Sequence, residues 1–101
     1  MRAFVAQPMW GKTDAEINAV RKKAQRILNE YFGKVEILDF KYEPDNVAHS
    51  HEYVANLSKV LKVMSDADIV YFAPGWNTDR ECVVEDMVAN LFGISTIIEE
   101  A

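Results

Sequence analysis

The sequence predicts an α/β fold with a parallel sheet, and three observations lead to this prediction. Short apolar segments alternate with longer segments in which apolar residues recur at helical spacing. The short segments are near-continuously apolar, which is typical of parallel strands covered by helices on both faces. The length of 101 residues suits one domain, 1–101, with a modest core.

The predicted elements follow the order βαβαβαβ. Strands are predicted at 2–6, 35–38, 68–73 and 94–98, and helices at 14–32, 52–65 and 79–92. The segment 39–51 is polar and is predicted to be irregular. With right-handed crossovers, this order gives a flavodoxin-like or Rossmann-like three-layer sandwich with a four-stranded parallel sheet.

Capping residues and apolar spacing predict the limits and faces of the helices. Thr13 with Glu16 forms a capping-box pattern before the first helix, and Gly33 is a stop signal at its end. Thr78 with Glu81 repeats the capping-box pattern before the third helix. Apolar spacing predicts that the core face of the third helix consists of Val84, Met87, Val88 and Leu91.

Composition argues against several classes of protein. The net charge of −5, from 16 acidic and 11 basic residues, disfavours nucleic acid as a partner. No apolar stretch approaches the ~18 residues of a membrane span, and the start lacks a signal-peptide pattern. The single Cys82 cannot form an internal disulfide, so we expect a cytoplasmic protein. His49 and His51 have no third ligand in view, so we expect no metal and no cofactor.

Two loops are predicted to meet at the carboxyl edge of the sheet, where open parallel sheets bind ligands. One follows the first strand at 7–12, and the other follows the third strand at 74–79. Each loop carries one tryptophan, Trp10 or Trp76, whose flat ring suits stacking on a nucleobase. The alternative for each ring is a cap on the core at the sheet edge.

Glu85 is the main candidate for catalysis. It lies about two turns into the third helix, which starts at the carboxyl end of a strand. A carboxylate there is ionised at neutral pH unless it is strongly buried, and an ionised carboxylate can attack the anomeric carbon of a sugar. The alternative is a surface glutamate in an acidic helix that also carries Glu81 and Asp86.

Two segments resemble the nucleoside 2-deoxyribosyltransferase-like family, which includes short phage and bacterial proteins of unassigned function. The first segment is Phe4-Val5-Ala6-Gln7-Pro8-Met9, followed by Gly11-Lys12-Thr13-Asp14. The second runs from Ala67-Asp68-Ile69-Val70 to Pro74-Gly75-Trp76, with Glu85 nine residues further on. The resemblance runs along the whole chain and implies a flavodoxin-like fold.

The resemblance also implies an activity, the cleavage or exchange of the N-glycosidic bond of a deoxynucleoside or its 5′-monophosphate. In the enzymes a glutamate of this helix attacks C1′ and forms a covalent glutamyl-sugar intermediate, and Glu85 matches that position. The implied substrate-binding residues are Phe4, Gln7, Pro8, Met9, Trp10, Gly75, Trp76, Asp79, Arg80 and Glu81.

The chain departs from the family pattern at four places, one of which is an aspartate of the helix before the third strand that has no clear counterpart among Lys59, Val60 and Leu61. Phe4 replaces a tyrosine that helps to position the nucleophile, and Gln7 replaces a glycine. Asp79-Arg80-Glu81 replaces a Ser-x-Gly pattern, and its carboxylates would repel a phosphate at the helix N-terminus. Three functions therefore stay open: an N-glycosidase or deoxyribosyltransferase, a non-catalytic sensor or sponge for a nucleotide-like ligand, and an interaction domain with a vestigial site.

The expected partner is a nucleoside or nucleotide small molecule, together with further copies of the chain. The resemblance implies a homodimer or a higher homo-oligomer whose neighbour completes the site. The second helix is the expected interface, because its apolar stripe is wider than one sheet face requires. The stripe consists of Tyr53, Val54, Leu57, Val60, Leu61 and Met64.

Overall fold

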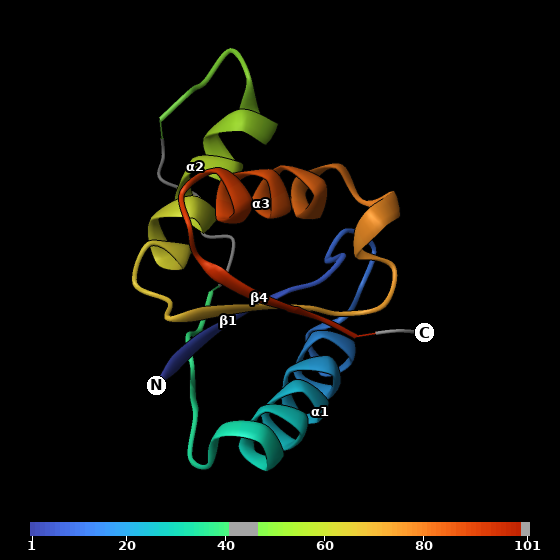
Figure 1. Cartoon of the computed structure of the whole chain (residues 1–101). Helices are drawn as coiled ribbons and strands as arrows, with labels where there is room; N and C mark the ends of the chain where they lie inside the picture. The colour runs from blue at the N-terminus through green and yellow to red at the C-terminus, as the bar shows by residue number, and fades with distance from the viewer. Residues whose placement is uncertain (41–46, 100–101) are drawn as a thin grey trace.

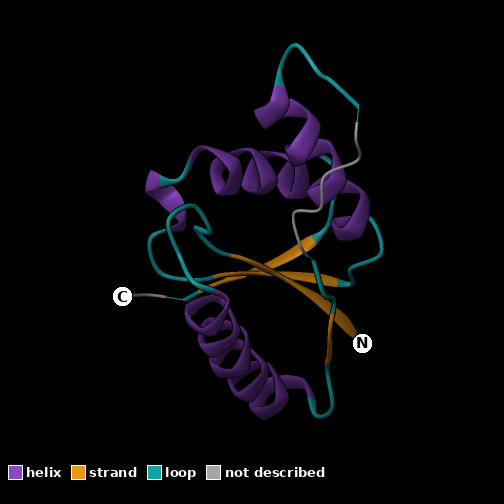
Figure 2. Cartoon of the chain, turned by 180° about the vertical axis from the view of Figure 1, so that it is seen from behind, coloured by secondary structure: helices purple, strands orange, loops and turns teal. Residues whose placement is uncertain are grey.

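The computed structural model describes residues 1–40 and 47–99 and confirms the α/β fold class, with one four-stranded parallel sheet (Figure 1). The strands are β1 (Arg2–Ala6), β2 (Glu36–Ile37), β3 (Ile69–Phe72) and β4 (Ser95–Ile98). The helices are α1 (Asp14–Phe32), α2 (Glu52–Met64) and α3 (Arg80–Leu91), and a short 3-10 helix, η1 (Trp76–Thr78), precedes α3. Figure 2 shows α1 on one face of the sheet and α2 and α3 on the other.

The strand order β2-β1-β3-β4 has its topological switch point between β1 and β3. The chain leaves β1 toward β2 and later returns on the other side of β1 as β3. Such a topological switch point opens a crevice at the carboxyl ends of the strands. The two loops lie close together at this point: a Cβ added to Gly75, whose φ is +90°, would lie 3.5 Å from Cγ of Pro8.

Two apolar clusters hold the helices to the sheet. Tyr71 of β3 and Leu28 of α1 belong to the first cluster, on the α1 face. Phe72 of β3, Val60 of α2 and Cys82 of α3 belong to the second cluster, on the opposite face. All of β3 is buried, as expected for a parallel strand that is covered on both sides.

The capping box predicted for the first helix is confirmed. The hydroxyl of Thr13 accepts the backbone N–H of Glu16 at 3.1 Å, and the Glu16 carboxylate accepts the backbone N–H of Thr13 at 3.0 Å. At the other end, Gly33 takes a positive φ of 81° and ends the helix as predicted. The local sequence therefore determines both limits of α1.

The capping box predicted from Thr78 and Glu81 is wrong. Thr78 belongs to η1, and its hydroxyl donates to the carbonyl of Gly75 at 3.0 Å. Asp79 is the N-cap of α3 instead, because its carboxylate accepts the backbone N–H of Cys82 at 3.0 Å. Aspartate caps helices at least as well as threonine does, so α3 begins one residue later than predicted, and Glu81 does not take part in the cap.

The core face predicted for the third helix is right for Val88, which packs against the second apolar cluster, but wrong for Met87 and Leu91. The buried residues of the helix are Cys82, Glu85 and Ala89, whereas Met87 is 55% exposed and Leu91 is 76% exposed. The buried stripe carries one carboxyl group, one thiol and one methyl group. Apolar spacing therefore favoured the neighbouring stripe, whose side chains are larger and more hydrophobic.

Strand and helix limits differ from the prediction in smaller ways. β2 covers residues 36–37 rather than 35–38, and β4 begins at Ser95 rather than at 94. β2 is short because it pairs only with Arg2 and Ala3 at the edge of the sheet. In the irregular segment 39–51, residues 39–40 and 47–51 carry no helix or strand, and residues 41–46 lie outside the described residues.

Two substitutions test which face of α3 is the core face. Leu91→Gln should change the free energy of unfolding of the monomer by less than about 0.5 kcal/mol, because the side chain is exposed in the single chain. Ala89→Leu should destabilise the protein by about 1–3 kcal/mol, because it adds atoms at a fully buried position. Urea unfolding measures both values. A larger loss for Leu91→Gln than for Ala89→Leu would contradict the orientation of α3.

Candidate functional site

Two clefts lie at the carboxyl edge of the sheet, on either side of the turn between β3 and α3. The α3 cleft has a volume of about 610 Å³ and is lined by Trp10, Tyr53, Val54, Leu57, Thr78, Asp79, Arg80, Glu81 and Val84. The α1 cleft has a volume of about 650 Å³ and is lined by Gln7, Pro8, Lys12, Glu16, Ala19, Val20, Lys23, Ala73, Pro74, Gly75, Thr78 and Glu99. Thr78 lines both clefts, so the turn separates them.

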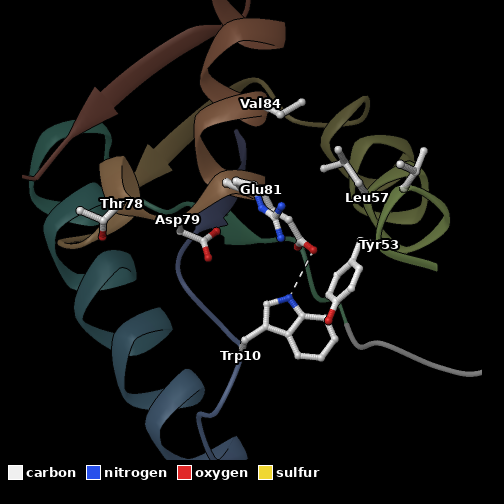
Figure 3. A pocket seen from close by; sticks show the side chains of 9 residues that line it. Trp10, Tyr53, Leu57, Thr78, Asp79, Glu81 and Val84 are labelled. Atoms are coloured by element: carbon white, nitrogen blue, oxygen red, sulfur yellow. Dashed lines mark hydrogen bonds between the residues drawn. The ribbon is translucent and has the colours of Figure 1, made fainter. Parts of the chain in front are cut away.

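An aromatic pair forms one wall of the α3 cleft (Figure 3). The rings of Trp10 and Tyr53 meet edge to face, with centroids 5.4 Å apart and planes at 62°. Nε1 of Trp10 donates to Oε1 of Glu81 at 3.3 Å, which joins the loop after β1 to α3. Because Trp10 is nevertheless 54% exposed, its ring is held in place and still open to a ligand.

The start of α3 supplies the charged groups of the α3 cleft. Asp79, Arg80 and Glu81 all line it, so the lining contains two carboxylates and one guanidinium group. Carboxylates are stable at a helix N-terminus, and they take the place that an anionic ligand would otherwise occupy. The cleft therefore suits a neutral or cationic ligand that donates hydrogen bonds.

Glu85 lies one helical turn beyond Glu81 and faces the core. It is 4% exposed and is absent from the linings of both described clefts. Burial raises the pKa of its carboxyl group to about 8, and the negative charges of Glu81 and Asp79 raise it further. Glu85 is therefore strongly buried and mostly protonated at neutral pH.

Cys82 lies beside Glu85 on the buried face of α3. Burial raises the pKa of its thiol, and the charge of Glu85 is the next largest cause. Only a thiolate is a good nucleophile. Cys82 therefore serves as a small core residue, packed between α3 and the sheet.

The structure divides the predicted substrate-binding residues among three places. Trp10, Asp79, Arg80 and Glu81 line the α3 cleft. Gln7, Pro8 and Gly75 line the α1 cleft. Phe4, Met9 and Trp76 pack in the apolar cluster under α2 and α3, where the ring centroids of Trp76 and Phe72 are 5.1 Å apart.

Several lining residues were missed by the sequence analysis. Tyr53 and Leu57 reach the α3 cleft from α2, although their spacing had placed them in an apolar stripe. Lys23 and Glu99 meet in the α1 cleft, where Nζ and Oε2 lie 3.1 Å apart across 76 residues of chain. No local pattern signals a pair so distant in the sequence.

Comparisons of the chain with protein-family models, with curated proteins and with solved structures found no match. The similarity to nucleoside 2-deoxyribosyltransferase-like proteins therefore remains a prediction from the two sequence segments. Of the helices within residues 1–40 and 47–99, none has both the length and the apolar character that a membrane crossing needs.

The raised pKa of Glu85 makes stability depend on pH. Between about pH 4.5 and about pH 8 the folded protein keeps a proton that the unfolded chain releases, so this residue lowers stability as pH rises. Glu85→Gln mimics the neutral carboxyl group and should remove that decline, which is at most about 1.4 kcal/mol per pH unit. Urea unfolding of both proteins across this range measures the effect. An equal decline in the two proteins would show that Glu85 is not held protonated.

Proposed function

We propose that the protein binds a nucleoside in the α3 cleft. The observation that supports this most directly is the exposed ring of Trp10, held against the acidic start of α3 by its hydrogen bond to Glu81. A base stacked on such a ring gains about 1–3 kcal/mol of binding energy. Tyr53 adds a second aromatic side chain beside the first.

The charges of the cleft favour a nucleoside over its 5′-monophosphate. The carboxylates of Asp79 and Glu81 accept hydrogen bonds, and the hydroxyl groups of a sugar donate them. The same two charges repel a phosphate, and Arg80 offsets only one of them. The ligand we propose therefore has a flat base and a hydroxylated sugar without a phosphate.

A second function, glycosyl transfer or N-glycosidic cleavage by Glu85, is favoured by the perturbed carboxyl group next to the cleft. Buried groups with shifted pKa values cluster at functional sites, and Glu85 lies one turn from Glu81, which lines the cleft. In this reaction the ionised carboxylate bonds to C1′ as the base leaves with the electrons of the N-glycosidic bond and takes a proton from water. A second water then attacks C1′, which breaks the bond to Glu85 and releases the sugar. Because only the ionised form attacks, the rate should rise with pH up to about 8.

We also propose that the chain forms a homodimer or a higher homo-oligomer. Tyr53 and Val54 on α2 and Met87 and Leu91 on α3 are exposed large apolar side chains. Val60 and Met64, from the same predicted stripe of α2, face the chain's own core instead. Sedimentation velocity at micromolar concentration tests the proposal, and a monomer alone would contradict it.

A cytoplasmic location also belongs to the proposal. The free thiol of Cys82 is buried, and a reducing compartment keeps such a thiol intact.

Ligand binding is tested by calorimetric titration with a panel of deoxynucleosides and their 5′-monophosphates. At least one nucleoside should bind, its 5′-monophosphate should bind more weakly, and Trp10→Ala should weaken binding about tenfold or more. Tyr31→Ala is the matched control, because Tyr31 is an exposed aromatic residue outside both clefts. No binding across the panel, or equal binding by the Trp10→Ala protein, would refute the nucleoside proposal.

Catalysis is tested with the same panel by chromatography of the free base at pH values from about 6 to about 9. Base release that rises up to about pH 8 and disappears in Glu85→Gln would support Glu85 as the nucleophile. A ligand recovered unchanged at every pH would leave binding as the function and remove glycosyl transfer.

A further inference from the structure

The α1 cleft is separate from the nucleoside site and lies on the other face of the sheet. It is formed by one side of the first turns of α1, including Glu16, Val20 and Lys23, and by the loops after β1 and β3. Glu99, which directly follows β4, also lines this cleft. The proposed function uses none of these residues.

Gln7 is the fixed polar group of this cleft. It is 5% exposed, and its Nε2 donates to the backbone carbonyl of Ile17 at 3.2 Å. Because Nε2 is the donor in that bond, Oε1 of Gln7 is the acceptor of the amide, and within the described residues no group donates a hydrogen bond to it. Within the same residues no fully buried side-chain oxygen lacks a partner, so this oxygen is not fully buried, and Gln7 lines the α1 cleft.

Glu99 is held in place by two donors. The hydroxyl of Tyr71, in the core, donates to Oε1 of Glu99, and Nζ of Lys23 pairs with Oε2 at 3.1 Å. Burial raises the pKa of the Tyr71 hydroxyl, so it keeps its proton and remains a donor. The cleft therefore has one carboxylate and one ammonium group in fixed positions.

A second pair of opposite charges lies at the α1 end of the cleft. Glu16 is engaged with Thr13 in the capping box, and this bond lowers the pKa of its carboxyl group, so it stays ionised. Lys12 also lines the cleft, and within residues 1–40 and 47–99 its ammonium group makes no ion pair. The lining thus balances two cations, Lys12 and Lys23, against two anions, Glu16 and Glu99.

This balance selects the kind of ligand. A simple anion meets Glu16 and Glu99, and a simple cation meets Lys12 and Lys23, so each is partly repelled. A ligand that carries one positive and one negative charge is attracted by the carboxylates and by the ammonium groups at the same time. The acceptor of Gln7 suits a donor on the ligand. The ammonium group of Lys12, which makes no ion pair within residues 1–40 and 47–99, suits an anion.

We propose that the α1 cleft binds a free α-amino acid in its zwitterionic form. The ammonium group of the ligand donates to Oε1 of Gln7 and lies among the carboxylates, and its carboxylate pairs with Lys12. Val20, Pro8 and Pro74 give the cleft an apolar wall for the side chain of the ligand.

The test is a titration of the ¹⁵N-labelled full chain with glycine and L-alanine, followed by amide chemical shifts. Saturable shifts should appear around Gln7, Lys12 and Gly75, and acetate or methylammonium alone should bind at least about tenfold more weakly. Lys12→Gln should weaken binding at least about tenfold. Lys22→Gln is the matched control, because Lys22 is an exposed lysine of α1 that lies outside the cleft.

The remaining variants separate this site from the nucleoside site. Gln7→Met should abolish amino-acid binding, and if that protein does not fold, Lys12→Gln alone decides. Trp10→Ala should leave amino-acid binding unchanged, whether or not nucleosides bind. The proposal is overturned by any of three results: no saturable shift up to on the order of 10 mM ligand, acetate binding as tightly as L-alanine, or equal binding by the Lys12→Gln protein.

Discussion

The burial of Glu85 beneath the acidic start of α3 is the constraint on which the rest of the site depends. With Cys82, Glu85 and Ala89 facing the core, the exposed side chains of α3 include Met87 and Leu91. The same orientation leaves Asp79 and Glu81 at the cleft, where one caps the helix and the other holds Trp10. Burial is the main reason that the Glu85 carboxyl group stays protonated, and these two charges raise its pKa further.

The turn between β3 and α3 has a comparable influence, because it divides the carboxyl edge of the sheet into two clefts. Gly75 turns the chain with a positive φ and lies near Pro8. The hydroxyl of Thr78, the last residue of η1, donates a hydrogen bond to the carbonyl of Gly75. The clefts differ in chemistry as a result. The α3 cleft joins an aromatic pair to carboxylates, whereas the α1 cleft balances ammonium groups against carboxylates beside a buried amide.

The fold was predictable from the sequence, and the site was predictable only in part. Apolar runs and the Thr13–Glu16 capping box act locally, so they identified the strands and α1 correctly. Glu85 misled the prediction for α3, because periodicity assumes that a charged residue faces water, whereas this carboxyl group is neutral and buried. Gln7 and Trp10 follow the same strand yet line different clefts, because a loop's direction depends on tertiary contacts such as Trp10–Tyr53.

The most direct test of this account is a measurement of the Glu85 pKa by ¹³C NMR of the side-chain carboxyl group, assigned by comparison with Glu85→Gln. The account predicts a pKa of about 8. Asp79→Asn should lower that value, because it removes one of the negative charges that raise it. A pKa near the ordinary value of 4.5 would contradict the account, because Glu85 would then be ionised and in contact with water at neutral pH.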